Sequence, residues 1–164
     1  MSGYSHRQSG PWGPVLEALG LGALGVALWR AFQGRLNTDF AFTFGAAAAV
    51  LLASGGLFSC LNVRDKGDRL SVRFGPIGLF GTSVPYGAIE SVEAARTRLV
   101  DGFGMHGLPG VYIVLNIWGM QAVRIRLKRR CGLWRARTVL IGTDEPEALL
   151  AFLRGRARQS APQS

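Results

Sequence analysis

Two apolar stretches decide the fold of this chain: VLEALGLGALGVALWRAF at residues 15–32 and FAFTFGAAAAVLLASGGLFSC at residues 40–60. The first stretch contains Glu17 and Arg30 as its only charged residues, and the second contains no charged residue. At 1.5 Å per residue, helices of these lengths are about 27 and 32 Å long, which matches a hydrocarbon core of about 30 Å. The sequence therefore predicts two membrane-spanning helices.

The link between the two stretches is short, so we expect an antiparallel helical hairpin over residues 14–61. Pro11 and Pro14 stand where a helix can begin, and residues 1–13 are predicted to be an N-terminal tail. Trp12 and Trp29 fall near the ends of the first span, where indole rings prefer the membrane interface. A cleaved signal peptide is disfavoured, because residues 28–32 (LWRAF) make a poor cleavage site.

Small residues recur along one stripe of each predicted helix, at spacings of three and four. Such stripes allow close approach of helix backbones in lipid. They indicate either the contact between the two helices of the hairpin or a surface for dimerisation. The residues are Ala18, Gly22 and Gly25 in the first helix and Gly45, Ala49, Ala53 and Gly56 in the second.

Charge is distributed unevenly along the chain. Of its 19 Lys and Arg and 10 Asp and Glu residues, positions 62–164 carry 16 and 8, a net charge of +8. A basic domain beside a bilayer attracts anionic headgroups, by about 1 kcal/mol for each nearby Lys or Arg. Nucleic acid is the other usual partner of a basic domain, and we rank it below the membrane because a membrane surface is already adjacent.

Basic residues flanking the spans predict the orientation. Arg64, Lys66, Arg69 and Arg73 follow the second span, whereas the hairpin loop contains only Arg35. The excess places both termini in the cytoplasm, so we expect a protein of the cytoplasmic (inner) membrane with its second domain in the cytoplasm.

From residue 62 onward, the apolar period changes from helical to alternating. Short segments separated by Gly-rich turns predict about six to seven antiparallel strands. The predicted strands cover residues 70–74, 79–84, 89–94, 111–115, 123–128 and 136–141. A C-terminal helix follows, with Asp144 as its N-cap, Leu149, Phe152 and Leu153 as its apolar face, and Gly155 as its end. Residues 157–164 are predicted to be a C-terminal tail.

This order of elements resembles a pleckstrin-homology-like (PH-like) domain, and the whole chain resembles bacterial membrane proteins that carry such a domain behind a helical hairpin. The resemblance rests on residues 67–76 (GDRLSVRFGP), 102–107 (GFGMHG) and 141–146 (IGTDEP). It implies a mainly β domain over residues 62–156 and a membrane location. The family is largely uncharacterised, so the resemblance implies no reaction.

Basic residues gather on and after one predicted strand. Arg124, Arg126 and Lys128 alternate with apolar residues and therefore share one face of the sheet. We expect this basic face to contact either a partner protein or anionic headgroups, with the exposed tryptophan inserted in the membrane. Its other members continue beyond the strand: Arg129, Arg130, Trp134, Arg135 and Arg137.

A Gly-rich segment is the second candidate contact region. Gly102, Gly104, Met105, His106 and Gly107 are predicted to form an interaction loop. The segment precedes a strand rather than a helix, so it lacks the helix N-terminus of phosphate-binding loops.

The sequence contains no nucleophile motif, no paired carboxylates and no metal-ligand spacing around Cys60 and Cys131. We therefore expect a protein that is not an enzyme and needs no cofactor or metal. Its expected function is that of a membrane-anchored scaffold or regulatory adaptor, with a protein partner or a second copy of itself. The alternative is an accessory subunit of a membrane transport or envelope-maintenance assembly.

Overall fold

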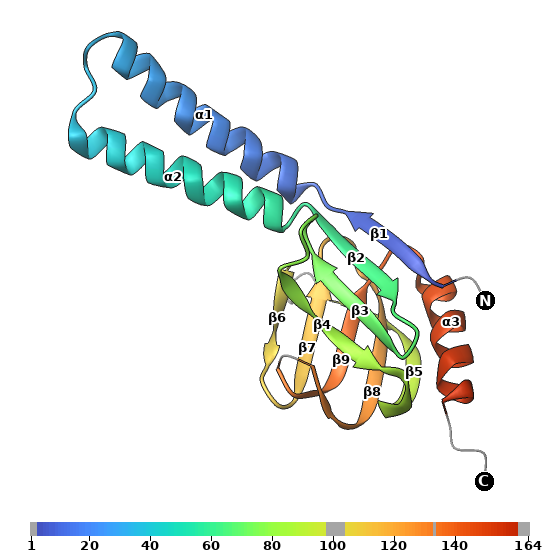
Figure 1. Cartoon of the computed structure of the whole chain (residues 1–164). Helices are drawn as coiled ribbons and strands as arrows, with labels where there is room; N and C mark the ends of the chain where they lie inside the picture. Colours follow the sequence, from blue (N-terminus) through green and yellow to red (C-terminus); the bar gives the residue numbers. More distant parts are fainter. Residues whose placement is uncertain (1–2, 98–103, 133, 161–164) are drawn as a thin grey trace.

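A helical hairpin projects from a β-rich domain in the computed structural model of the chain (Figure 1). The structure describes residues 3–97, 104–132 and 134–160. Helices α1 (Trp12–Phe32) and α2 (Thr38–Leu57) are long and apolar enough to cross a membrane. Only 6% and 11% of their most apolar segments are buried, so they are not core helices of the β domain.

The helix ends follow from local chemistry. The side chain of Asn37 accepts a hydrogen bond of 2.8 Å from the backbone N–H of Phe40, which caps the start of α2. Helix α2 ends at Leu57 rather than at the predicted Cys60, because Cys60 begins a strand. The connection between the helices is short, as the sequence predicts.

The contact between α1 and α2 uses small residues other than those of the predicted stripes. Gly13, Gly20, Ala48 and Gly55 are buried between the helices, and a Cβ on Gly20 would lie 2.8 Å from Cγ of Leu52. The predicted stripes instead face outward. No atom lies within 4 Å of a Cβ built on the four glycines of those stripes, Gly22, Gly25, Gly45 and Gly56. The assignment of these stripes to the contact within the hairpin is therefore wrong.

The β domain consists of two sheets that enclose one apolar core. The first sheet has the order β1-β2-β3-β4, with all its neighbours antiparallel. Its strands are β1 (Ser5–Ser9), β2 (Cys60–Asp65), β3 (Arg69–Phe74) and β4 (Phe80–Pro85). The second sheet has the order β5-β8-β9-β7-β6. Its strands are β5 (Ile89–Arg96), β6 (Gly104–Leu108), β7 (Tyr112–Asn116), β8 (Gln121–Cys131) and β9 (Ala136–Gly142).

The described residues thus form nine strands, against the predicted six to seven. The predicted N-terminal tail contributes β1, which pairs with β2 from Ser5 opposite Arg64 to Ser9 opposite Cys60. The prediction of an entirely antiparallel sheet is wrong at one pair, since β7 and β9 run parallel. This pairing arises because the β6–β7 hairpin lies outside β9, so the chain crosses over between β7 and β8.

Helix α3 (Pro146–Gln159) completes the domain. Its Leu149 and Leu153 are fully buried in the core shared by the two sheets, as the apolar face predicts. The helix continues past Gly155, whose Cβ position is open, so glycine does not end it. Its N-cap is Glu145 rather than the predicted Asp144, and Oδ1 of Asp144 lies 2.6 Å from Nε2 of His6 in β1.

Candidate functional site

The two ends of the β domain differ in their distance from the hairpin. At the helix-proximal end, Trp12, Leu16, Phe58, Gly104 and Ile117 line an apolar cavity of about 300 Å³. The backbone N–H of Gly10 donates to the carbonyl of Ser59 at 3.3 Å at this same end. The first residues of β8 follow the loop after Ile117, so β8 begins near the hairpin and runs away from it.

The predicted basic face is present on β8 and β9. Arg124, Arg126 and Lys128 point outward between buried apolar neighbours. Together with Arg137 they line an open hollow of about 620 Å³ that also includes Glu90, Leu127 and Thr138. We call these four basic residues the distal basic surface.

Acidic side chains neutralise only part of this surface. One oxygen of Glu93 lies 3.0 Å from Nη1 of Arg124 and 3.8 Å from Nη2 of Arg126. Within the described part of the chain, no carboxylate pairs with Lys128 or Arg137. The outer end of the surface therefore keeps its positive charge available for a ligand.

The distal basic surface lies far from the helix-proximal end. Lys128 lies seven residue steps after Gln121 along β8, which corresponds to a distance of up to about 23 Å. The Debye length at physiological ionic strength is about 8 Å. A bilayer at the ends of the helices would therefore be largely screened from Lys128 and Arg137.

The remaining basic residues of the predicted face lie at the same far end. Arg129 and Arg130 are exposed near the end of β8, and the exposed Arg135 adopts φ +48° in the turn before β9. The backbone N–H of Arg137 donates to the carbonyl of Val111 at 3.0 Å, beside the turn between β6 and β7. Trp134 behaves differently, because it is half-buried and packs against the core. It is not positioned to insert in a membrane.

The Gly-rich segment is mostly a strand. Gly104, Met105, His106 and Gly107 belong to β6 at the edge of the second sheet, and Gly102 lies outside the described residues. Met105 packs against the core. A Cβ on Gly107 would lie 2.3 Å from the carbonyl oxygen of Tyr112, so this glycine allows the close pairing of β6 with β7.

A buried ion pair connects α3 to the first sheet. The carboxylate of Asp65 is only 4% exposed and pairs with the guanidinium of Arg156. It also accepts hydrogen bonds of 2.8 Å from the Gly67 N–H and from the Tyr86 hydroxyl. The guanidinium lies 5.6 Å from the ring centre of Tyr86 and 5.5 Å from that of Phe152. These contacts hold α3 against the end of β2.

The protonation of this cluster follows from its contacts. Burial alone would raise the pKa of Asp65, but the three donors outweigh burial, and the pKa is lowered from its ordinary value. Burial, and then the hydrogen bond to Asp65, raise the pKa of the Tyr86 phenol. The pair therefore remains charged at neutral pH. The sequence analysis did not predict this ion pair, because 91 positions separate Asp65 from Arg156.

Neither cysteine belongs to a metal-binding cluster in the described part of the chain. Cys60 is buried and Cys131 is half-buried, and both are free thiols. Among residues 3–97, 104–132 and 134–160, no group of three or more His, Cys, Asp and Glu side chains could hold a metal ion.

Comparisons of the chain with protein-family models, with curated proteins and with solved structures found no match.

Proposed function

We propose that this chain is a membrane-anchored interaction module. In this proposal α1 and α2 anchor the chain in the cytoplasmic membrane, and a PH-like β domain extends into the cytoplasm. The distal basic surface binds an acidic region of a partner protein. The chain then acts as a scaffold or regulatory adaptor, without chemistry of its own.

The position of the distal basic surface is the observation that carries this proposal. Its outer residues, Lys128 in the second half of β8 and Arg137 at the start of β9, lie at the end of the domain remote from the hairpin. Screening at this distance favours an acidic protein over the adjoining membrane as the ligand. Packed sheets with a C-terminal helix that fills the core between them support the PH-like interpretation.

Charge reversal on the intact chain tests the proposal. The variant Arg126→Glu/Lys128→Glu/Arg137→Glu reverses three positive charges on the distal basic surface. The control Arg96→Glu/Arg154→Glu/Arg158→Glu reverses three positive charges on arginines that are exposed elsewhere in the domain. Each tagged chain is purified from its native membrane in mild detergent, and the bound proteins are quantified by mass spectrometry.

We expect the unaltered chain and the control to retain an acidic protein that the distal variant loses. Recovery should also fall as salt is raised, because the contact depends on charge. Equal recovery of the same proteins by the distal variant and the control would contradict the proposal.

The outward-facing small residues favour a second candidate, an accessory subunit of a membrane transport or envelope-maintenance assembly. In that case the hairpin packs against larger membrane partners through faces that include Gly22, Gly25 and Gly45. Replacement of residues 12–57 by an unrelated helical hairpin separates the two candidates. An adaptor keeps its partner after this exchange, whereas an accessory subunit loses it.

A further inference from the structure

Two cavities lie on opposite sides of the turn between β3 and β4, beside the end of α2. Both are lined by the same four residues of the turn, Gly75, Pro76, Ile77 and Gly78. The backbone N–H of Gly75 donates to the carbonyl of Cys60 at 2.7 Å, which fixes the turn against the chain leaving α2. The turn therefore has a set position relative to the hairpin.

The first cavity is an apolar groove of about 340 Å³ between α2 and the turn. On the helix side it is lined by Leu52, Ala53, Gly56 and Leu57, and on the other side by the turn residues up to Leu79. Leu52 lies five residues before the end of α2, so the groove extends about 7 Å along the helix. In a bilayer spanned by α2, this groove reaches the acyl chains.

The turn itself presents large apolar side chains to the surroundings. Ile77 is 80% exposed, Leu79 is 64% exposed, and Phe80 is 48% exposed. Contiguous exposed apolar surface of this kind marks an interaction site, because removing it from water is favourable. Next to the end of a membrane-spanning helix, the bilayer is the apolar phase at hand.

The second cavity is a polar hollow of about 300 Å³ on the outer face of the first sheet. It is lined by Asn62, Arg64, Lys66, Ser71 and Arg73. Arg7 of β1 lies directly opposite Asn62, which in turn lies opposite Arg73, so these three side chains share one face. In the described residues, none of Arg7, Arg64, Lys66 and Arg73 has a carboxylate partner.

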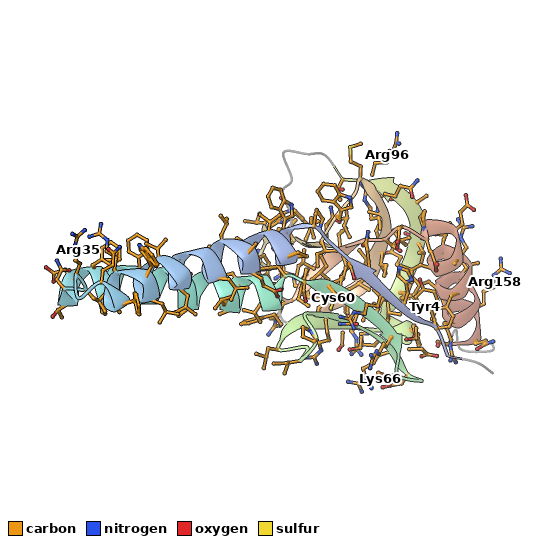
Figure 2. All side chains as sticks on the ribbon, turned by 90° about the horizontal axis from the view of Figure 1, so that it is seen from above. Tyr4, Arg35, Cys60, Lys66, Arg96 and Arg158 are labelled. Atoms are coloured by element: carbon orange, nitrogen blue, oxygen red, sulfur yellow. The ribbon has the colours of Figure 1, made fainter. Side chains whose placement is uncertain are left out.

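The depth of Arg7 and Arg73 suits a lipid headgroup, and Arg64 lies two residues further along β2. Figure 2 shows Cys60 at the junction between the hairpin and the domain, and Lys66 at the far end of β2. The row that contains Arg7 and Arg73 lies two residues beyond Cys60, a distance of about 7 Å. The headgroup layer of one leaflet is about 5–8 Å thick. Unlike the distal basic surface, this row lies within one Debye length of the bilayer.

Arg73 links the two cavities. Its Nη1 donates to the carbonyl of Gly78 at 3.2 Å, so one of its five N–H groups holds the turn and the others remain available. Arginine N–H groups form charge-assisted hydrogen bonds with phosphate oxygens. A ligand with a phosphate and an apolar chain would therefore satisfy both cavities at once.

We infer that the β3–β4 turn and the arginines beside it form a binding site for an anionic phospholipid of the adjoining leaflet. The phosphate occupies the polar hollow beside Arg64 and Arg73, with Arg7 on the same face of the sheet, and an acyl chain lies in the groove between α2 and Leu79. This inference rests on the membrane anchoring in the proposed function, but not on the distal basic surface. The bound lipid would fix the orientation of the β domain relative to the membrane.

The test uses the full chain in nanodiscs made of equal parts phosphatidylglycerol and phosphatidylcholine. Native mass spectrometry then gives the ratio of the two lipids retained by the chain. The variant Arg7→Gln/Arg64→Gln removes two of the arginines and keeps Arg73, which holds the turn. The control Arg154→Gln/Arg158→Gln removes the same charge from the exposed face of α3.

We expect the unaltered chain and the control to be enriched in phosphatidylglycerol. In the Arg7→Gln/Arg64→Gln variant, the ratio of retained phosphatidylglycerol to phosphatidylcholine should fall about tenfold. This fall corresponds to about 1.4 kcal/mol of binding free energy. A second variant, Ile77→Ser/Leu79→Ser, should reduce the number of lipids of either kind that remain bound. Neither variant touches the core, so the thermal unfolding of the β domain should be unchanged and serves as the check on folding.

Equal enrichment in the unaltered chain and the Arg7→Gln/Arg64→Gln variant would overturn the inference. So would a loss of enrichment caused by Arg126→Glu/Lys128→Glu/Arg137→Glu, because those residues lie at the other end of the domain. Failure of the unaltered chain to enter the bilayer would instead overturn the anchoring itself, and the inference with it. Lipid enrichment without any acidic protein partner would support this site and contradict only the proposed function.

Discussion

The ion pair between Asp65 and Arg156 gives a prediction that depends on the described contacts alone. The change is Arg156→Leu, which keeps an apolar side chain at this position and removes the guanidinium that lies over Tyr86 and Phe152. The carboxylate of Asp65 then stays buried with two donors, the Gly67 N–H and the Tyr86 hydroxyl. Helix α3 loses its polar connection to β2.

The expected loss of folding stability follows from the burial of the ion pair. Loss of one partner from a buried ion pair costs about 3–5 kcal/mol. The Arg156 side chain is 21% exposed and Asp65 keeps two hydrogen bonds, so the lower figure applies. For a domain of about 100 residues, a change of 3 kcal/mol lowers the melting temperature by about 15 °C.

The pH dependence distinguishes lost charge from lost packing. The pKa of Asp65 is lowered in the folded chain, so its stabilisation is present above the unfolded pKa near 4 and is lost as pH falls through the folded value. Arg156→Leu removes the part of that stabilisation that comes from the guanidinium. The difference in stability between the two chains should therefore be largest above pH 5 and shrink in more acidic solution.

The assay is thermal unfolding of the full chain in mild detergent, followed by tryptophan fluorescence at a series of pH values. Trp134 packs against the core and reports on the β domain. The control is Arg158→Leu, an exposed arginine on the same helix, which should shift the melting temperature little. A destabilisation by Arg156→Leu that is the same at pH 3 and pH 7 would refute the ion-pair reasoning.

Three further substitutions test the packing of the β domain, the first two by the same thermal unfolding assay and the third by amide hydrogen exchange. Gly155→Ala should stabilise the chain by about 0.5–1 kcal/mol, because its Cβ position in α3 is open; a destabilisation would contradict the helical assignment. Leu149→Ala should cost about 3 kcal/mol, since Leu149 is fully buried, and an unchanged melting temperature would show that α3 does not pack on the core. Gly107→Ala should separate β6 from β7 through its clash with Tyr112, visible as faster amide hydrogen exchange in β6; unchanged exchange would rule out this pairing.

The sequence was most informative where one residue type dominates a long stretch. An uncharged run such as residues 40–60 predicts an apolar helix without knowledge of its neighbours. Alternation also worked for β8, and for β3 except at Ser71, which is buried although it lies on the polar face. In both cases the signal is local, because the spacing of apolar residues within the segment is enough to assign its structure.

Edge strands were missed for a physical reason. Strand β1 has the sequence SHRQS, in which Gln8 is the only buried residue, so no apolar alternation marks it. It is defined by its pairing with β2, and that pairing is not visible in a local pattern. Strand β6 was missed for the same reason, because it is rich in glycine and lies at the edge of its sheet.

The candidate sites show the same limit. Alternation correctly predicted that Arg124, Arg126 and Lys128 share a face, but it gave no distance from the membrane. The arginine row at the β3–β4 turn was not recognised, because Arg7 and Arg73 come from distant strands that meet on either side of β2. Only the order of strands in the sheet brings them together.

The central claim of this account is that the two helices cross a membrane and place the β domain on its cytoplasmic side. Cysteine accessibility in intact cells tests it most directly, in a background in which Cys60 and Cys131 are replaced by alanine. Single cysteines are placed at Leu36, between α1 and α2, and at Ser160, after α3. A membrane-impermeant maleimide should label the cysteine at position 36 in intact cells, and the one at position 160 only after permeabilisation. Equal labelling of both positions in intact cells, or the reverse pattern, would contradict the account.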